Sequence, residues 1–176
     1  MTLACAVLTL SDSVVSGSRK DSSGDQVQVM IESSGLQVVY RDVLPDNRED
    51  IAALLRQLCS RSDIQCVLTT GGTGIGPRDV TPEATQDVVE RTLPGMAEAM
   101  RSETLKKTPF AMISRQVVGV RQGTLIVNLP GSPKGVSECL EVILPVLNHV
   151  VNLIAGHTRH EEDMSSEPPQ DNSAGV

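Results

Sequence analysis

The sequence predicts an α/β protein in which a mostly parallel sheet lies between two layers of helices, a three-layer sandwich. Strand-like and helix-like segments alternate along the 176 residues, as they do when crossover helices join parallel strands. Several strand-like segments are continuous apolar runs, which is typical of strands covered on both faces. Hydrophobic residues make up 39% of the chain and are almost all aliphatic, so one core of ordinary size is expected.

The first strand–helix–strand unit lies near the N-terminus. Residues 3–10 (LACAVLTL) form an apolar run typical of a buried strand. Residues 25–33 carry apolar side chains at helical spacing, and we expect Gly35 to end this helix. Residues 37–44 predict a second strand, which Pro45 stops.

The middle of the chain repeats this unit. Asn47 is suited to cap a helix whose leucine and isoleucine side chains form one stripe. Residues 64–70 predict the third strand, which leads into a glycine-rich loop. Thr81 and Pro82 suit the N-cap and first turn of a helix that we expect to continue to about Arg91.

The C-terminal part is predicted to hold two helices and two strands. A helix is expected over residues 94–105, because a proline opens it. Strands are expected near residues 111–118 and 124–129, on either side of a glycine-containing turn. The last helix is predicted over residues 133–155, with Ser132 as its cap.

The charge distribution divides the chain into two predicted parts. Residues 1–156 are expected to form one domain, and residues 157–176 an acidic, disordered tail. This tail holds five acidic residues and one basic residue, so it supplies −4 of the formal net charge of −7. Its composition offers too little apolar surface to fold.

Composition also restricts the classes of function. The negative net charge and the presence of only two aromatic residues, Tyr40 and Phe110, argue against nucleic-acid binding. The four cysteines form no CxxC pair, so we expect buried, reduced thiols. No basic leader and no apolar run of about 18 residues is visible, which predicts a cytoplasmic protein without a membrane segment.

Chemically suggestive residues follow the predicted strands. Ser11 and Asp12 follow the first strand, Asp46 the second, residues 71–79 the third, and residues 128–134 the last. Ligands of open α/β sheets bind beyond the carboxyl ends of the strands, so these segments are expected to form one site. Taken singly, each also has a plainer interpretation as a turn or a helix cap.

The glycine-rich stretch LTTGGTGIGPRDVTPEAT (residues 68–85) resembles a phosphate loop but matches neither familiar nucleotide motif. A P-loop ends in Gly-Lys-Ser/Thr, whereas Pro77 and Arg78 follow the last glycine here. The dinucleotide motif runs directly into a helix, and Pro77 interrupts that continuation. The glycines would still let backbone N–H groups approach phosphate oxygens closely, and two predicted helix N-termini nearby favour anions.

Several segments together carry a resemblance to a known family. They are GGTG followed by PRDVTPEAT, LPD at 44–46, MISR at 112–115 and NLPGSPKG at 128–135. On these segments the chain resembles the molybdopterin adenylyltransferases, which are bacterial enzymes and the G domains of gephyrin and its plant counterpart. The resemblance implies the molybdopterin-binding, G-domain-like fold and a homotrimer. It also implies that ATP, with Mg²⁺, adenylylates the terminal phosphate of molybdopterin and releases pyrophosphate.

The resemblance further implies roles for single residues. Asp46 and Asp79 take the places of the family's two functional carboxylates, and hard carboxylate oxygens suit Mg²⁺. Arg78, Arg115 and Lys134 are candidates to hold phosphates. By the family's motifs, the remaining nucleotide- or pterin-binding candidates are Gly71, Gly72, Thr73, Gly74, Ser114, Asn128, Pro130, Gly131 and Ser132. Ser11 and Asp12 are candidates only through their place after the first strand, where a strand-ending turn is an equally open interpretation.

Two functions stay open at this point. One is the adenylyltransferase, and the other is a non-catalytic, trimeric molybdopterin-binding or scaffold module of the same fold. The paired carboxylates favour the enzyme. The molybdate-inserting domain that is fused in gephyrin has no counterpart in this sequence, so we expect a separate protein to perform that step.

Overall fold

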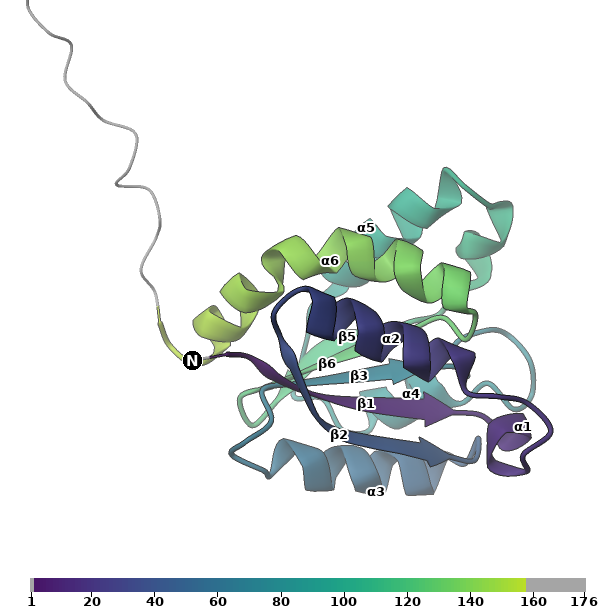
Figure 1. The fold of residues 1–176 in the computed structure, drawn as a ribbon, viewed down its shortest axis with the longest axis horizontal. Coiled ribbons are helices and arrows are strands. Elements are labelled where there is room, and N and C mark those ends of the chain that lie inside the picture. The colour runs from purple at the N-terminus through teal and green to yellow at the C-terminus, as the bar shows by residue number, and fades with distance from the viewer. Residues whose placement is uncertain (1, 158–176) are drawn as a thin grey trace, which may run out of the picture.

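The computed structural model describes residues 2–157, and most of its elements follow the predicted order (Figure 1). The strands are β1 (Ala4–Leu10), β2 (Gln37–Leu44), β3 (Cys66–Thr70), β4 (Arg91–Thr92), β5 (Val118–Arg121) and β6 (Thr124–Leu129). The helices are α1 (Asp12–Val15), α2 (Ser22–Ser33), α3 (Arg48–Cys59), α4 (Thr81–Gln86), α5 (Pro94–Leu105), α6 (Pro133–Ile154) and the 3-10 helix η1 (Pro109–Ile113). The predicted tail lies, apart from His157, outside the described residues.

The six strands form one sheet in the order β2-β1-β3-β6-β5-β4. The strands β2, β1, β3 and β6 are parallel to one another, whereas β5 and β4 add an antiparallel edge. The turn between β5 and β6 places Gln122 at φ 48° and Gly123 at φ 83°, which suits the twist of a two-residue hairpin. The mostly parallel α/β sheet is confirmed.

Helices cover both faces of this sheet, so the three predicted layers are present. The core on one face joins α2, α5 and α6, and the core on the other face joins α3 and α4 (Figure 1). Side chains of β1 alternate between them, with Cys5 and Val7 in the first core and Ala6 and Leu8 in the second. A strand covered on both faces has no polar side to show, which explains its continuous apolar sequence. All four cysteines are free and buried, as predicted.

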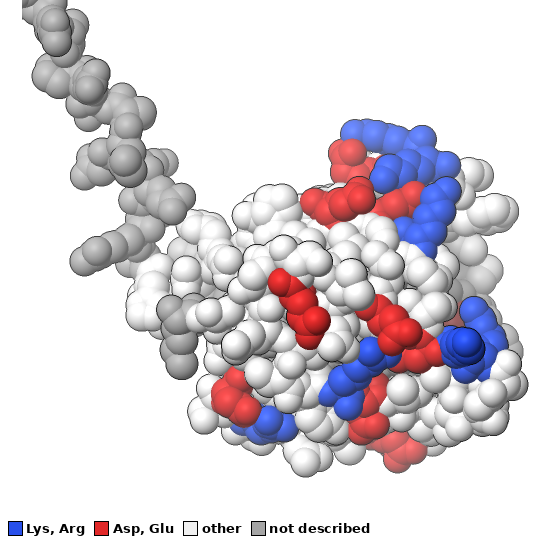
Figure 2. Space-filling model, in the orientation of Figure 1, with Lys and Arg blue, Asp and Glu red and all other residues white. Residues whose placement is uncertain are grey.

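The helix α6 has the length and apolar composition of a membrane span, although we expected no segment of that kind. Its buried residues, which include Leu140, Ile143 and Leu147, pack in the core against the sheet. We therefore describe α6 as a partly buried core helix. On the face shown in Figure 2, Lys and Arg side chains lie among Asp and Glu side chains and form no broad basic surface.

Two predictions around α4 were wrong. The helix ends at Gln86 instead of continuing to Arg91, because Arg91 belongs to β4 and pairs with β5. Thr81 is not the N-cap either. Val80 holds that position without a side-chain hydrogen bond, and the Thr81 hydroxyl donates to the carbonyl oxygen of Gly71 at 2.9 Å.

The strand predicted near residues 111–118 was also misplaced. Residues 109–113 form η1, in which the Thr108 side chain caps the N–H of Phe110, and the strand starts only at Val118. Smaller differences concern α2, which begins at Ser22 behind an Asp21 cap, and β3, which starts two residues later than predicted. The four-residue helix α1 was not predicted.

Candidate functional site

A crevice opens between the carboxyl ends of the adjacent strands β1 and β3. The chain leaving β1 proceeds to α2 on one face of the sheet, and the chain leaving β3 proceeds to α4 on the other. Loops that diverge in this way leave space for a ligand. A cavity of about 200 Å³ lies there, lined by Leu10 and Ser11 after β1 and by Thr70, Gly71 and Gly72 at the end of β3. We call it the smaller cavity.

A second, larger cavity of about 370 Å³ lies between the glycine loop, η1 and the start of α6. Phe110 and Ile113 give it an apolar wall, and Glu138 contributes a carboxyl group. Gly72, Asp79 and Gly131 line both cavities, so the two spaces meet at these three residues. We call this meeting point the neck.

The two predicted carboxylates, Asp46 and Asp79, both line the smaller cavity. Asp46 Oδ2 accepts a hydrogen bond from the Asp12 N–H at 3.0 Å, and Asp79 Oδ2 accepts one from the Gly76 N–H at 2.7 Å. Within residues 2–157, neither Oδ1 atom accepts a hydrogen bond. Burial raises the pKa of Asp46, and the nearby charges of Asp12 and Asp79 add to the rise.

This pair of carboxylates fits Mg²⁺ bound together with a nucleotide. Mg²⁺ keeps several waters and takes one or two carboxylates plus substrate phosphates, so it needs no complete protein cage. The described residues contain no group of three or more His, Cys, Asp or Glu that could hold a metal ion. Asp46 and Asp79 line the same cavity and each keeps one oxygen atom free of hydrogen bonds within residues 2–157, so they match that donor set.

The glycine loop lines the cavities and contains backbone N–H groups that no other group in residues 2–157 accepts. The N–H groups of Gly72, Thr73 and Gly74 donate to no other group in the described part of the chain. Successive free backbone donors of this kind are suited to bind an anion. The loop also passes too close to its neighbours for a side chain at Gly72. There φ is 62°, and a Cβ would meet Thr81 Oγ1 and would lie 3.2 Å from Asp46 Oδ1.

Arg115 was predicted to hold phosphate, but its side chain instead forms hydrogen bonds to the backbone of the glycine loop. Its Nε donates to the carbonyl oxygen of Gly74 and its Nη2 to that of Asp79, each at 2.7 Å. Its Nη1 pairs with the carboxylate of Glu83, an ion pair that lowers the pKa of Glu83. The Arg115 N–H donates to Thr73 O at 2.9 Å. The guanidinium group therefore fixes the loop that carries Asp79.

Four other predicted ligand-binding residues, like Arg115, line neither cavity. Arg78 and Asp12 form a two-pronged ion pair, with the shortest N–O distance 2.7 Å, and this pair lowers the pKa of Asp12. Lys134 is 80% exposed. Asn128 is fully buried and braces the sheet, because it bonds to Thr69, Thr85 and Val117.

The other predicted residues do come together around the two cavities. Ser114 is notable among them, because its buried Oγ has no hydrogen-bond partner within residues 2–157 although the residue lines the larger cavity. The remaining predicted residues that line one or both cavities are Ser11, Gly71, Gly72, Thr73, Gly74, Pro130, Gly131 and Ser132.

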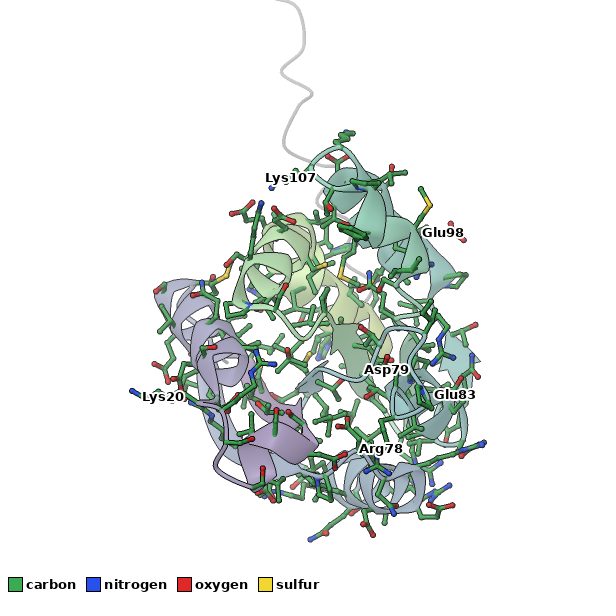
Figure 3. The ribbon with its side chains drawn as sticks, turned by 90° about the vertical axis from the view of Figure 1, so that its right-hand side faces the viewer. Lys20, Arg78, Asp79, Glu83, Glu98 and Lys107 are labelled. Atoms are coloured by element: carbon green, nitrogen blue, oxygen red, sulfur yellow. The ribbon has the colours of Figure 1, made fainter. Side chains whose placement is uncertain are left out.

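Sequence reasoning missed several lining residues. Arg19 and Lys20 line the smaller cavity, and their only signal was a basic doublet in a serine-rich segment. The Lys20 side chain extends outward, away from Asp79 (Figure 3). Phe110 and Glu138 line the larger cavity, because η1 folds back beside α6. Tyr40, the other aromatic residue, lines neither cavity. No spacing rule connects η1 with α6.

The fold and the crevice are those of an α/β ligand-binding domain, and comparisons with known proteins give its family. Residues 6–149 match the family described as probable molybdopterin binding domain. The molybdopterin adenylyltransferase of Helicobacter pylori is 40% identical over 158 residues, which cover 89% of this chain and 90% of that protein. Gephyrin of Dictyostelium discoideum is 42% identical over 84% of this chain, which spans only 22% of gephyrin.

A solved structure agrees with these sequence matches. The molybdopterin biosynthesis enzyme MoaB of Thermus thermophilus superposes with a TM-score of 0.83 at 43% identity, covering 88% of this chain and 98% of that one. The chain therefore belongs to the family of molybdopterin-binding domains of molybdenum cofactor biosynthesis.

Proposed function

We propose that this protein transfers the adenylyl group of ATP to the terminal phosphate of molybdopterin. The observation that carries the proposal is that Asp46 and Asp79 both line the smaller cavity, that each keeps one oxygen atom free of hydrogen bonds within residues 2–157, and that Asp79 lies at the neck. Two cavities that meet at a neck allow two phosphorylated substrates to approach each other phosphate to phosphate. Relatives named molybdopterin adenylyltransferase support the same reaction.

The proposed step is a displacement at phosphorus. An oxygen atom of the molybdopterin phosphate attacks the α-phosphorus of ATP, the bond to the bridging oxygen of the β-phosphate breaks, and pyrophosphate leaves. Free N–H groups of Gly72, Thr73 and Gly74 would hold phosphate oxygens near the neck. Asp46 and Asp79 would hold Mg²⁺, which offsets the negative charge developing on the leaving group when it is bound.

The experiment is single-turnover formation of adenylyl-molybdopterin from ATP and molybdopterin, with pyrophosphate release followed in parallel. Asp46→Asn and Asp79→Asn should each slow transfer by about 10²–10³, because a loss of about 3–4 kcal/mol of charge stabilisation corresponds to that factor. Molybdopterin binding should persist, since backbone donors remain. Asp87→Asn is the matched control, because Asp87 pairs with Arg48 outside both cavities.

Excess Mg²⁺ should rescue part of the defect if the substitutions weaken metal affinity. Absence of molybdopterin-dependent pyrophosphate release from the wild-type protein would contradict the proposal and favour a scaffold. A homotrimer, a separate molybdate-inserting partner and a cytoplasmic location complete the proposal. Those three parts rest on sequence motifs and composition alone.

A further inference from the structure

Glu138 is a nearly buried carboxylate without a hydrogen-bond donor in the described residues. Its side chain is 9% exposed and borders the larger cavity. Its Oε1 lies 3.9 Å from Lys134 Nζ and 4.0 Å from Lys107 Nζ, which is too far for hydrogen bonds. These two ammonium groups supply counter-charge, and both lie where α5 and α6 approach each other. Buried carboxylates are normally satisfied by donors, and because Glu138 lines the larger cavity, a molecule bound there could supply them.

The walls around Glu138 suit a flat ring. Phe110 and Ile113 provide apolar surface on one side of the larger cavity. Cys139 follows Glu138 on α6, and burial raises the pKa of its thiol to about 12, so this neighbour stays uncharged. Asp79 also lines the cavity, but it belongs to the glycine loop and lies at the neck. Glu138 is therefore the carboxylate on the α6 wall.

We propose that Glu138 determines specificity by accepting two parallel N–H bonds from the 2-amino-4-oxopyrimidine edge of a pterin. This edge presents a ring N–H beside an amino group, and a carboxylate binds such a pair of donors with both oxygens. Adenine presents a ring acceptor beside its amino group, so its lone pair would face the carboxylate. The larger cavity then takes the pterin, and the smaller cavity takes the nucleotide. The inference deepens the proposed function and rests on it for the division of substrates.

The test compares two ligands without ATP. One is the phosphate ester of 6-hydroxymethylpterin, and the other is the corresponding lumazine ester, in which a carbonyl oxygen replaces the amino group. Wild-type protein should bind the pterin ester about 10- to 100-fold more tightly, the factor expected for hydrogen bonds to a charged group. Glu138→Gln should lower pterin affinity by about the same factor and remove the preference, because one acceptor becomes a donor.

Glu141→Gln is the matched control. Glu141 lies one turn further along α6, is 63% exposed and approaches Lys107 at 3.6 Å, so this variant removes the same charge beside the same lysine. It should bind both esters as the wild type does. If Glu138→Gln fails to fold, the ratio of the wild-type affinities for the pterin and lumazine esters still tests the inference.

Equal wild-type affinities for the two esters, or no binding of the pterin ester up to millimolar concentration, would overturn the inference. Retained preference in folded Glu138→Gln would also overturn it. These outcomes are separate from adenylyl transfer. Loss of the transfer reaction with an intact, Glu138-dependent ligand preference would remove the proposed function and leave pterin recognition standing.

Discussion

Asp12 and Asp46 hold each other through two reciprocal hydrogen bonds. The Asp12 N–H donates to Asp46 Oδ2, and the Asp46 N–H donates to Asp12 Oδ1, both at 3.0 Å. Arg78 joins from the glycine loop through its ion pair with Asp12. Loops that follow β1, β2 and β3 are thus connected at one point, and that connection fixes one orientation of the Asp46 carboxylate.

Asp12→Ala should therefore slow adenylyl transfer, although Asp12 lines neither cavity. The variant removes the acceptor for the Asp46 N–H and for Arg78, so we expect about a tenfold lower single-turnover rate, the cost of about one charge-assisted hydrogen bond. Substrate affinity should change less than the rate. Asp63→Ala is the control, because Asp63 forms a comparable exposed ion pair with Arg61. A wild-type rate in Asp12→Ala would mean that the backbone N–H of residue 12, which the variant keeps, is enough to orient the Asp46 carboxylate.

Asp46→Asn should stabilise the folded protein at neutral pH even though it impairs the reaction. Burial raises the pKa of Asp46, so the folded state binds this proton more tightly than the unfolded state does. The associated stability is present at low pH and is lost as pH rises from the unfolded pKa of about 3.9 through the raised value. We expect the Tm to rise by roughly 1 °C at pH 7, since Asp46 is only partly buried and solvent screens its charge.

The gain from Asp46→Asn should shrink as pH falls through the raised pKa of Asp46, and it should be absent below the unfolded value of about 3.9. Thermal melts across this pH range measure it. A lower Tm in the variant at pH 7 would show that the hydrogen bond from Asp12 outweighs the burial of the charge.

Gly72→Val should disrupt the glycine loop. The φ of 62° disfavours a branched side chain, and its Cβ would meet the Thr81 hydroxyl that anchors the loop. We expect at least about tenfold weaker ATP binding, since such backbone strain costs about 1–3 kcal/mol. Calorimetric titration with ATP measures the loss. Gly95→Ala is the control, because its Cβ meets no atom within 4 Å. Unchanged affinity in Gly72→Val would remove Gly72 from the site.

Arg115→Lys should loosen the same loop without removing positive charge. An ammonium group reaches fewer of the three acceptors that the guanidinium group binds, namely the Gly74 and Asp79 carbonyls and the Glu83 carboxylate. We expect the transfer rate to fall about tenfold and the free energy of unfolding to fall by about 1–2 kcal/mol. Arg48→Lys, at an exposed ion pair with Asp87, should change both values little.

Local signals explain which elements could be predicted from the sequence. Pro45 ends β2 and Pro94 begins α5, so these boundaries were predicted correctly, and Ser132 caps α6 as its side chain suggested. The two-residue strand β4 could not be predicted, since it exists only through pairing with β5. The start of β5 was missed because η1 occupies residues whose apolar character also suits a strand.

In the candidate site too, some residues could be predicted from the sequence, whereas others depend on contacts that only the fold creates. Asp46 and Asp79 were predicted because they match the places of the family's two functional carboxylates, and because loops after parallel strands meet at one edge of the sheet. Arg115 was assigned to phosphate because a guanidinium group binds carbonyl, carboxylate and phosphate oxygens alike, and only the fold shows which of these lie nearby. Glu138 was missed because a single carboxylate on a long helix is normally expected to face solvent. Only the folded structure shows that η1 and the end of α5 line the same cavity.

The scarcity of aromatic side chains has an optical consequence. With no tryptophan, and with Tyr40 on β2 outside both cavities, the protein has almost no fluorescence of its own near its ligands. Emission from a bound pterin would therefore report on its surroundings without energy transfer from tryptophan. Phe110 is the aromatic ring that lines the larger cavity, so stacking on it would be the aromatic contribution to quenching there. Tyr40 would independently report unfolding of the sheet, which makes ligand release and unfolding spectrally separable in one sample.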